Sequence, residues 1–295
     1  MPRAHHPTEE FPAHLNRLYE RFPFDRSLAQ DPLSCVRPFG RDPRSAEIAG
    51  IYAATLAIGT TTSIRGAIGR FIERAGPDLP AFVERADSAR TSADFREFRH
   101  RWIRGDQLVH LARRLRRIYA DEGSLEAVFL RGFEQRSGGE FALGVDALAR
   151  ALRGPVGDAA APRGYAALFP SPLDRNSPCK RLVLFARWMV RPDYPDLGIW
   201  TRVAPSSLRI PLDQHVYWIA YHLGLTRRRT RTWATVEEVT AALRRIDPND
   251  PIKYDFVLCH TGISGDCPKV RDEAVCGPCA VRPDCRLWKG ITWSG

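Results

Sequence analysis

Apolar residues recur every three or four positions along most of the chain, which is the spacing of amphipathic helices. The clearest helix is predicted for residues 106–122, where apolar side chains face inward and four arginines face mostly outward. Comparable patterns predict helices at 14–22, 124–136, 142–153, 178–190, 213–224 and 233–245, and one that ends near Gly262. No segment alternates convincingly between apolar and polar residues, so the sequence predicts an all-α fold.

Two further helices are predicted on either side of a run of hydroxyl side chains. The first begins at Ala46, with Ser45 as its expected cap, and one of its sides carries small residues that let another helix or a ligand backbone come close. The run Thr60–Ser63 interrupts the pattern, and the second helix continues to Arg74. These hydroxyls either cap the second helix or reach into a groove.

Two segments between predicted helices have distinctive compositions. Residues 94–104 combine aromatic and basic side chains, which suits stacking on bases and contact with phosphates, although the edge of an amphipathic helix has the same composition. Residues 154–164 are rich in Gly, Pro and Ala. They are the best candidate for a hinge or a boundary between two lobes.

The chain carries an excess of positive charge, with a formal net charge of +10 and a pI near 9.6. This balance favours a polyanionic partner, either nucleic acid or an anionic membrane face. The length of 295 residues and the hydrophobic content of 44% allow two lobes or one large domain. No signal-peptide core is present in the first ten residues and no stretch approaches the ~18 apolar residues of a membrane span, so we expect a cytoplasmic protein without membrane association.

Four of the seven cysteines lie close together near the end of the chain, with eight, two and five residues between them: Cys267, Cys276, Cys279 and Cys285. In a reducing compartment this clustering favours a metal site over disulfides. Four thiolates can hold either a tetrahedral zinc ion or a [4Fe–4S] cluster, and the single Cys-x2-Cys pair favours the cluster. Cys35, Cys179 and Cys259 are interpreted as ordinary thiols.

Lysine is rare in this chain, since only four of the 44 basic residues are lysines and 40 are arginines. A lysine in such a background suggests that an amine is needed. A buried lysine can lose its proton and attack carbon, whereas arginine stays protonated. Lys180, in Ser-Pro-Cys-Lys-Arg, is therefore the candidate nucleophile, and a lysine that binds phosphate is the alternative.

Asp213 follows Pro211 and precedes an apolar helical pattern, so it is expected at or near a helix N-cap. Free backbone N–H groups and the helix dipole would hold its carboxylate in the ionised form there. Asp213 is the candidate catalytic carboxylate, and a plain helix cap is the alternative.

Together, the lysine, the capping aspartate and the cysteine loop make residues 165–288 resemble the helix-hairpin-helix DNA glycosylase superfamily, the group of endonuclease III and 8-oxoguanine glycosylase. The segment Arg-Ile-Pro-Leu-Asp-Gln-His-Val-Tyr-Trp-Ile-Ala around Asp213 looks like the one that carries the family's catalytic aspartate, and its Pro-x-Asp-x-His-Val form is closest to the 8-oxoguanine branch. Lys180 falls where bifunctional members place their nucleophilic lysine. The ending Cys267 to Cys285 is similar to the endonuclease III cluster loop, and blocks such as Cys-Lys-Arg-Leu-x-Leu-Phe-x-Arg-Trp-Met-Val-Arg resemble a divergent, uncharacterised bacterial branch.

The resemblance implies a two-lobed helical helix-hairpin-helix glycosylase-type fold with a four-cysteine cluster loop at 267–285. One lobe is expected at 46–204, ending in the hairpin-like segment of Lys180, and the other from 1–45 together with 205–295. The implied partner is double-stranded DNA that contains a damaged base. We expect a monomer, associated with the nucleoid.

The implied activity is that of a DNA glycosylase with associated AP lyase activity in base excision repair. The damaged base would be flipped out of the duplex, and Lys180 would attack C1′ of its sugar to leave a Schiff base. Asp213 would stabilise the positive charge that develops on the sugar. The expected DNA contacts are His215, Arg181, Lys269 and Arg271, and a [4Fe–4S] cluster would shape the basic loop.

Three features depart from the family pattern. Asn176-Ser177-Pro178-Cys179 stands where the family hairpin usually reads Gly-x-Gly, the stretch Arg191 to Pro205 looks inserted, and the first cysteine gap is longer than usual. Two alternatives stay open: a monofunctional glycosylase in which Asp213 activates water, and a non-catalytic nucleic-acid-binding protein with a four-cysteine zinc loop. Oxidised purine is the first expectation for the lesion, and oxidised pyrimidine the second.

Overall fold

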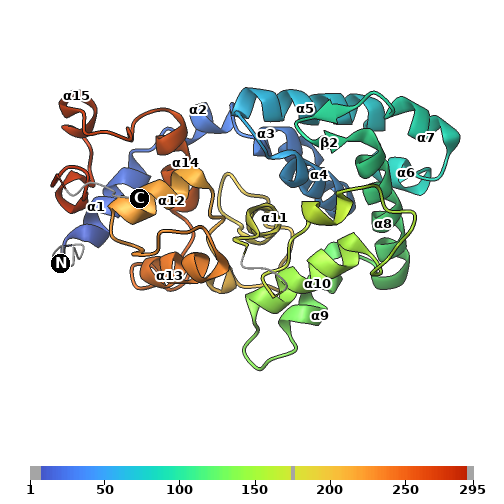
Figure 1. Ribbon diagram of the computed structural model, residues 1–295. Helices are drawn as coiled ribbons and strands as arrows, with labels where there is room; N and C mark the ends of the chain where they lie inside the picture. Colours follow the sequence, from blue (N-terminus) through green and yellow to red (C-terminus); the bar gives the residue numbers. More distant parts are fainter. Residues whose placement is uncertain (1–7, 174–176, 291–295) are drawn as a thin grey trace. The chain divides into compact units, whose positions relative to one another are not determined.

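The computed structural model describes residues 8–173 and 177–290, and these are predominantly helical (Figure 1). The expected all-α class is therefore confirmed. The strands in the described residues are the two-residue β1 (Arg99–His100) and β2 (Ile103–Arg104), which pair in antiparallel orientation. Neither strand is long enough to show an alternating pattern in the sequence. Of the helices in the described chain, none is both long enough and apolar enough to span a bilayer.

The chain folds into two compact units. Of the described residues, the smaller unit contains 8–24, 177–180 and 208–290, and the larger contains 25–173 and 181–207. From the sequence we expect residues 25–45 in the lobe that corresponds to the smaller unit. The structure groups these residues with the larger unit, because their short helices pack on the helix that follows them. The Gly-, Pro- and Ala-rich loop at 154–164 lies within the larger unit instead of between the two.

The larger unit contains most of the helices. In chain order they are α2 (Phe24–Leu28), α3 (Leu33–Val36), η1 (Arg37–Phe39), α4 (Pro43–Leu56), α5 (Thr61–Ala75), α6 (Leu79–Glu84), α7 (Ala89–Asp94), α8 (Gly105–Glu122), α9 (Leu125–Phe133), α10 (Phe141–Arg153), η2 (Tyr165–Leu168), α11 (Lys180–Val190) and η3 (Pro205–Ser207). Lys180, the first residue of α11, groups with the smaller unit, whereas the rest of this helix belongs to the larger one.

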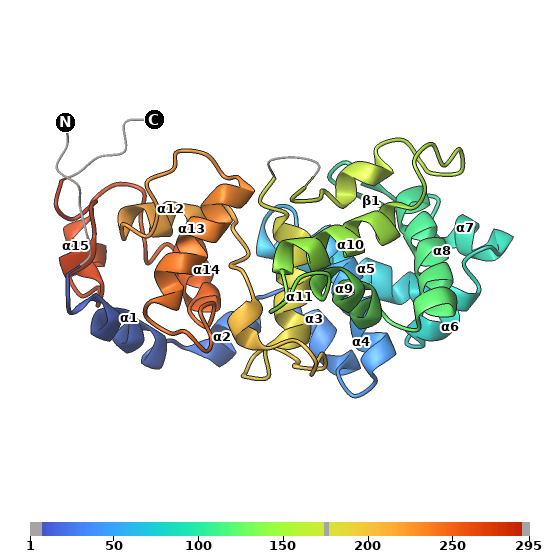
Figure 2. The same cartoon turned by 90° about the horizontal axis from the view of Figure 1, so that it is seen from below.

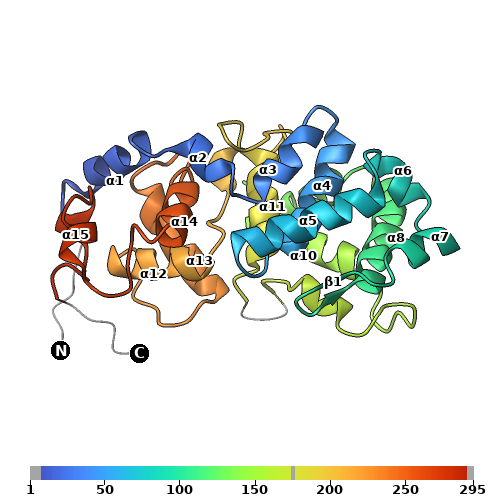
Figure 3. The ribbon, with the colours of Figure 1, turned by 90° about the horizontal axis from the view of Figure 1, so that it is seen from above.

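Helix α4 lies in the core of the larger unit, next to α5 (Figure 3). Its small residues let α11 come close, since a Cβ on Gly50 would lie 2.8 Å from the Met189 methyl carbon. Tyr52 stacks on Phe71 of α5 with ring centroids 4.0 Å apart. The close approach of a second helix that the small residues indicated is therefore found at Gly50.

The caps of α4 and α5 settle two expectations. The cap of α4 is Asp42, whose carboxylate accepts a hydrogen bond from the Ser45 backbone N–H at 2.8 Å, so the expectation that Ser45 caps this helix was wrong. The helix begins at Pro43, before the apolar pattern starts, so Ser45 lies inside its first turn. Thr60 caps α5 by accepting from the Ser63 N–H at 3.3 Å, which confirms the capping alternative for the hydroxyl run.

The stretch after α11 that looked inserted contributes to the core of the larger unit. The buried Asp196 pairs with two buried arginines, Arg187 and Arg191, at 3.2 and 2.7 Å. The Trp200 indole N–H donates to the Glu47 carboxylate of α4 at 2.8 Å. These contacts fix the stretch as part of the fold.

The smaller unit is built from helices of both chain ends: α1 (Phe11–Glu20), α12 (Gln214–His222), α13 (Trp233–Arg244), α14 (Asp255–Ile263), α15 (Glu273–Cys276) and η4 (Arg282–Asp284). Helices α12 and α14 pack closely, with α13 beside them (Figure 2). Tyr19 of α1 contacts Tyr254, at the start of α14, with ring centroids 5.9 Å apart. This unit contains both the candidate carboxylate and the four-cysteine loop.

Candidate functional site

Asp213 is the N-cap of α12, as the sequence predicts. Its Oδ1 accepts a hydrogen bond from the Val216 backbone N–H at 2.8 Å. Its Oδ2 accepts from the Cys259 thiol of α14 at 3.4 Å. The half-buried carboxylate is therefore held on one oxygen by its own helix and on the other by a neighbouring helix.

A glycine brings α14 against the first turn of α12. A Cβ on Gly262 would lie 2.8 Å from the Cβ and 3.0 Å from the Nδ1 of His215. Cys259 and Gly262 are three residues apart on α14 and so share one face of the helix. That face fixes the position of both His215 and Asp213.

Lys180 is the first residue of α11 and is half-buried. Among the described residues, no hydrogen bond or ion pair engages its side chain. The residue before it, Cys179, is buried and has a φ of +49°, a backbone conformation that non-glycine residues rarely adopt. The candidate hairpin segment begins at Asn176, which lies outside the described residues.

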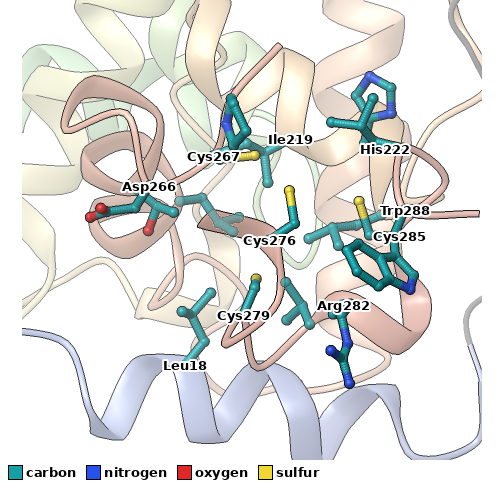
Figure 4. Close-up of a pocket in the computed structure, with 16 residues that line it drawn as sticks. Leu18, Ile219, His222, Asp266, Cys267, Cys276, Cys279, Arg282, Cys285 and Trp288 are labelled. Atoms are coloured by element: carbon teal, nitrogen blue, oxygen red, sulfur yellow. The ribbon is translucent and has the colours of Figure 1, made fainter. Parts of the chain in front are cut away.

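The four clustered cysteines line one pocket, as Figure 4 shows. Its cavity volume is about 40 Å³, several times the ~10–15 Å³ that one water molecule needs. Apolar side chains of α1, α12 and α14 form much of the remaining wall, including Leu18, Ile219 and Leu258. The sequence prediction that these cysteines converge is consistent with this pocket.

Short local elements hold each cysteine in place. Cys276 is the last residue of α15, which Asp272 caps by accepting from two backbone N–H groups at 2.9 and 3.2 Å. The Cys267 backbone N–H binds a carbonyl of α14 at 3.0 Å. Cys285 follows η4 directly. The loop is therefore ordered by backbone hydrogen bonds as well as by its side chains.

The four cysteines of the pocket are the residues that could hold a soft metal ion or an iron–sulfur cluster. Burial, with a further contribution from the other three cysteines, raises the pKa of Cys267 to about 12. Burial also raises the pKa of Cys279 and Cys285. A bound cationic group would offset this cost, because thiolate is the form that binds metals.

A zinc ion and an iron–sulfur cluster require different arrangements of the sulfur atoms. Within residues 8–173 and 177–290, no three His, Cys, Asp or Glu side chains are gathered closely enough to hold a single metal ion. Tetrahedral zinc requires sulfur atoms about 2.3 Å from one centre. An iron–sulfur cluster would take four cysteines around a larger inorganic core, and the four cysteines that could hold either group line this one pocket.

His222 lines the same pocket and was not identified from the sequence. It ends α12, its side chain is 1% exposed, and neither ring nitrogen has a hydrogen-bond partner in the described chain. Burial, helped by the charge of Arg286, lowers its pKa to about 4, so the imidazole is neutral. In the sequence it sits at a position of α12 that periodicity assigns to the core. The Cys259 contact was also missed, since no local pattern joins residues 46 positions apart.

The N-terminal helix is tied to the cysteine loop through Asp284. This buried carboxylate accepts hydrogen bonds from the Thr8 backbone and hydroxyl at 2.8 and 2.6 Å, and it pairs with His14 of α1 at 2.7 Å. Asp284 directly precedes Cys285. Residues near the start of the chain therefore hold the cysteine loop near its end in place.

The predicted DNA contacts have different surroundings. Lys269 is exposed and, among the described residues, has no hydrogen bond or ion pair. Arg271 lies 4.2 Å from the Trp288 ring centroid and pairs with Glu273. Arg181 belongs to the larger unit, where it donates to the Ala167 carbonyl at 3.1 Å. His215 packs on α14, as described above, so Lys269 is the least constrained of the four.

Comparison with known proteins gives one result. Residues 31–264 match the family model described as "Protein of unknown function (DUF2400)". The matched region includes Lys180, Asp213 and Cys259, and it ends before Cys267. No curated protein and no solved structure matches the chain significantly. Because the match spans more than half of its length, the chain belongs to the DUF2400 family.

Proposed function

We propose that this protein is a DNA glycosylase with AP lyase activity that removes an oxidised base from duplex DNA. The observation that carries the proposal is the grouping of Lys180 with Asp213. Each lies at the start of a helix and both belong to the smaller unit, although residues 181–207 between them belong to the larger one. One residue supplies an amine and the other a carboxylate.

Asp213 would act through its negative charge. Loss of a base leaves positive charge on the sugar, and a carboxylate with a fixed orientation stabilises that charge without reorganising. The hydrogen bonds from Val216 and Cys259 supply the fixed orientation. In this role Asp213 accepts no proton while the glycosidic bond breaks.

Lys180 would act as the nucleophile. Nζ would attack C1′, the C1′–N bond would break, and the base would leave with that electron pair and take up a proton, while the attacking amine releases one. The C1′–O4′ bond then breaks with uptake of a proton by O4′, and the nitrogen electron pair forms a protonated imine between Nζ and C1′. Abstraction of a C2′ proton sends its electron pair toward this imine and expels the 3′ phosphate. The absence of an ion pair on Lys180 among the described residues is consistent with a reactive amine.

The four cysteines would hold a [4Fe–4S] cluster, with zinc as the alternative. Bound there, the group would supply cross-links that order residues 267–285 and would take no part in base removal. Lys269 and Arg271 of this loop would then contact phosphates.

The larger unit offers a surface suited to nucleic acid. The turn between β1 and β2 carries Arg101 and Trp102, and the Trp102 side chain is 47% exposed. An exposed indole beside guanidinium groups suits stacking on a base and contact with the backbone. The net charge of +10 agrees with such a partner.

Borohydride trapping tests the proposal. The protein is incubated with duplexes that carry 8-oxoguanine, thymine glycol, uracil or an abasic site, and Lys180→Ala and Asp213→Asn are compared with the wild type. We expect a covalent adduct with the wild type that is lost in Lys180→Ala and strongly reduced in Asp213→Asn. Base release without any adduct would favour the monofunctional alternative. If neither base release nor adduct forms on any duplex, the proposed activity is refuted.

A further inference from the structure

The loop that joins α12 to α13 can be followed in Figure 2. Its sequence carries a concentrated positive charge. Four of its five residues from 227 to 231 are arginines, and all of them are exposed. They are Arg227, Arg228, Arg229 and Arg231. From Thr226 to Thr232 the loop contains only threonine and arginine.

The backbone of this loop is fixed at four points. The Tyr217 hydroxyl donates to the Arg228 carbonyl at 3.0 Å, and the Arg228 N–H donates to the Thr226 hydroxyl at 3.1 Å. The Arg227 N–H binds Glu238 at 3.0 Å, and the Thr235 hydroxyl donates to the Thr230 carbonyl at 2.6 Å. A loop ordered in this way presents its side chains with little further loss of backbone entropy on binding.

The helix that follows the loop carries fewer charges than the loop. Helix α13 contains two acidic residues, Glu237 and Glu238. Glu237 pairs with Arg209 at 2.7 Å, and Glu238 pairs with Arg228 at 2.9 Å. The four arginines of the loop therefore outnumber the two carboxylates of α13, one of which pairs with an arginine outside the loop.

The arginine run of α8 provides a contrast. Arg113 and Arg116 both pair with Asp87, and Arg114 donates to the Ala151 carbonyl at 2.8 Å. These three side chains hold structural elements together. The arginine loop instead is ordered through its backbone, and all four of its arginines are exposed.

The loop lies beside the helix that Asp213 caps. Tyr217, which binds the loop carbonyl, is in the first half of α12, four residues after Asp213. Arg229 and Arg231 are close enough to Tyr217 to affect its ionisation electrostatically. Helix α12 therefore links the candidate carboxylate, which caps its start, to the loop that follows its end.

We propose that residues 227–231 bind the phosphate backbone of the nucleic acid whose sugar faces Asp213. This inference rests on the proposed function, because it identifies the polyanion as the DNA substrate. Guanidinium groups bind phosphate oxygens in bidentate fashion. The loop offers no apolar side chain that would insert into a bilayer, which favours nucleic acid over a membrane surface.

Salt-dependent binding tests the inference. Arg229→Gln/Arg231→Gln and the wild type are titrated with a labelled abasic duplex by fluorescence anisotropy at several salt concentrations. We expect weaker binding and a slope of log K against log salt that is smaller by about two, one for each lost phosphate contact. The matched control is Arg26→Gln/Arg117→Gln, which removes the same charge from two exposed arginines of the larger unit and should keep the wild-type slope.

The outcomes separate this inference from the proposed function. At saturating duplex the loop variant should still form the trapped adduct, since Lys180 and Asp213 are intact. If the variant binds with the wild-type slope while the wild type forms the adduct, the loop inference fails and the proposed function stands. If the wild type binds no duplex but binds phosphatidylserine vesicles, and the loop variant does not, the loop is a membrane contact and the nucleic-acid assignment is overturned.

Discussion

At the scale of single residues, Asp213 shows how a local signal and a tertiary contact combine. Its capping bond to Val216 follows from the sequence around it, because an aspartate before an apolar helical pattern is a common N-cap. Its second bond, from Cys259, depends on the packing of α14 against α12. The carboxylate is oriented by both, so its orientation is sensitive to a residue that the sequence indicates only as a thiol.

Removal of the Cys259 thiol should slow base release. In Cys259→Ala the second oxygen of Asp213 loses its donor, and a hydrogen bond of about 1 kcal/mol corresponds to a roughly fivefold lower single-turnover rate. Cys259→Ser keeps an O–H donor and should recover most of the rate. Cys35→Ala, a half-buried thiol in the larger unit, serves as the control. Equal rates for the alanine and serine variants would show that the thiol does not position Asp213.

At the scale of elements, helix length decides what the sequence can predict. The helix expected at 106–122 is α8, Gly105–Glu122, because five turns display a full apolar stripe. Helices α6 and α7 have six residues each and were not predicted, since fewer than two turns show no period. The segment 94–104 was ambiguous for the same reason, because it contains the last residue of α7 and a hairpin whose two strands have two residues each.

The crossing of α12 and α14 should depend on Gly262. A methyl group there overlaps with His215, and overpacking of this kind costs about 1–3 kcal/mol. Gly262→Ala should therefore lower the free energy of unfolding, measured by urea denaturation. Gly69→Ala on α5 is the matched control, because no atom lies within 4 Å of its added Cβ and alanine favours a helix by about 1 kcal/mol. Stabilisation by both substitutions would refute the close crossing.

The connection between α13 and α14 contains an ion pair with a defined pH window. Lys253 Nζ lies 2.6 Å from Asp247 Oδ2. Although burial acts against the charged form of both groups, the pairing lowers the pKa of Asp247 and raises that of Lys253. The stabilisation is therefore complete between about pH 4 and pH 10, the ordinary pKa values of the two groups.

The stabilisation by this ion pair is lost for a different reason on each side of the pH window. Below it, Asp247 is protonated as the pH falls through its lowered pKa, and above it Lys253 loses its proton as the pH rises through its raised pKa. The free energies of unfolding of the wild type and Lys253→Gln, measured by urea denaturation, should differ by about 1 kcal/mol near pH 7 and should converge at both extremes. The exposed Lys289→Gln should show no such profile. A difference that is independent of pH would assign the effect to packing of the lysine stem.

At the scale of the whole molecule, the sequence predicts the helical class. It also identifies the candidate site residues Lys180 and Asp213 and the four cysteines of 267–285. It does not predict that 25–45 joins the larger unit, because that grouping depends on α3 and η1 packing on α4. It also does not reveal that Thr8 and His14 bind Asp284 from the other end of the chain. Contacts between distant segments have no local pattern, and these contacts complete the cysteine loop.

The presence of a cluster or metal ion in the cysteine loop should therefore control the stability of the smaller unit. We expect the protein purified without oxygen to contain iron and acid-labile sulfide in equal amounts, and Cys276→Ser to lose both. Because Asp284 joins the loop to α1, loss of the group should also lower the unfolding midpoint, as metal binding and folding are linked. Cys35→Ser, outside the pocket, should keep both the group and the midpoint. Stoichiometric zinc without sulfide would identify the zinc alternative, and wild-type stability in Cys276→Ser would show that the loop folds without any bound group.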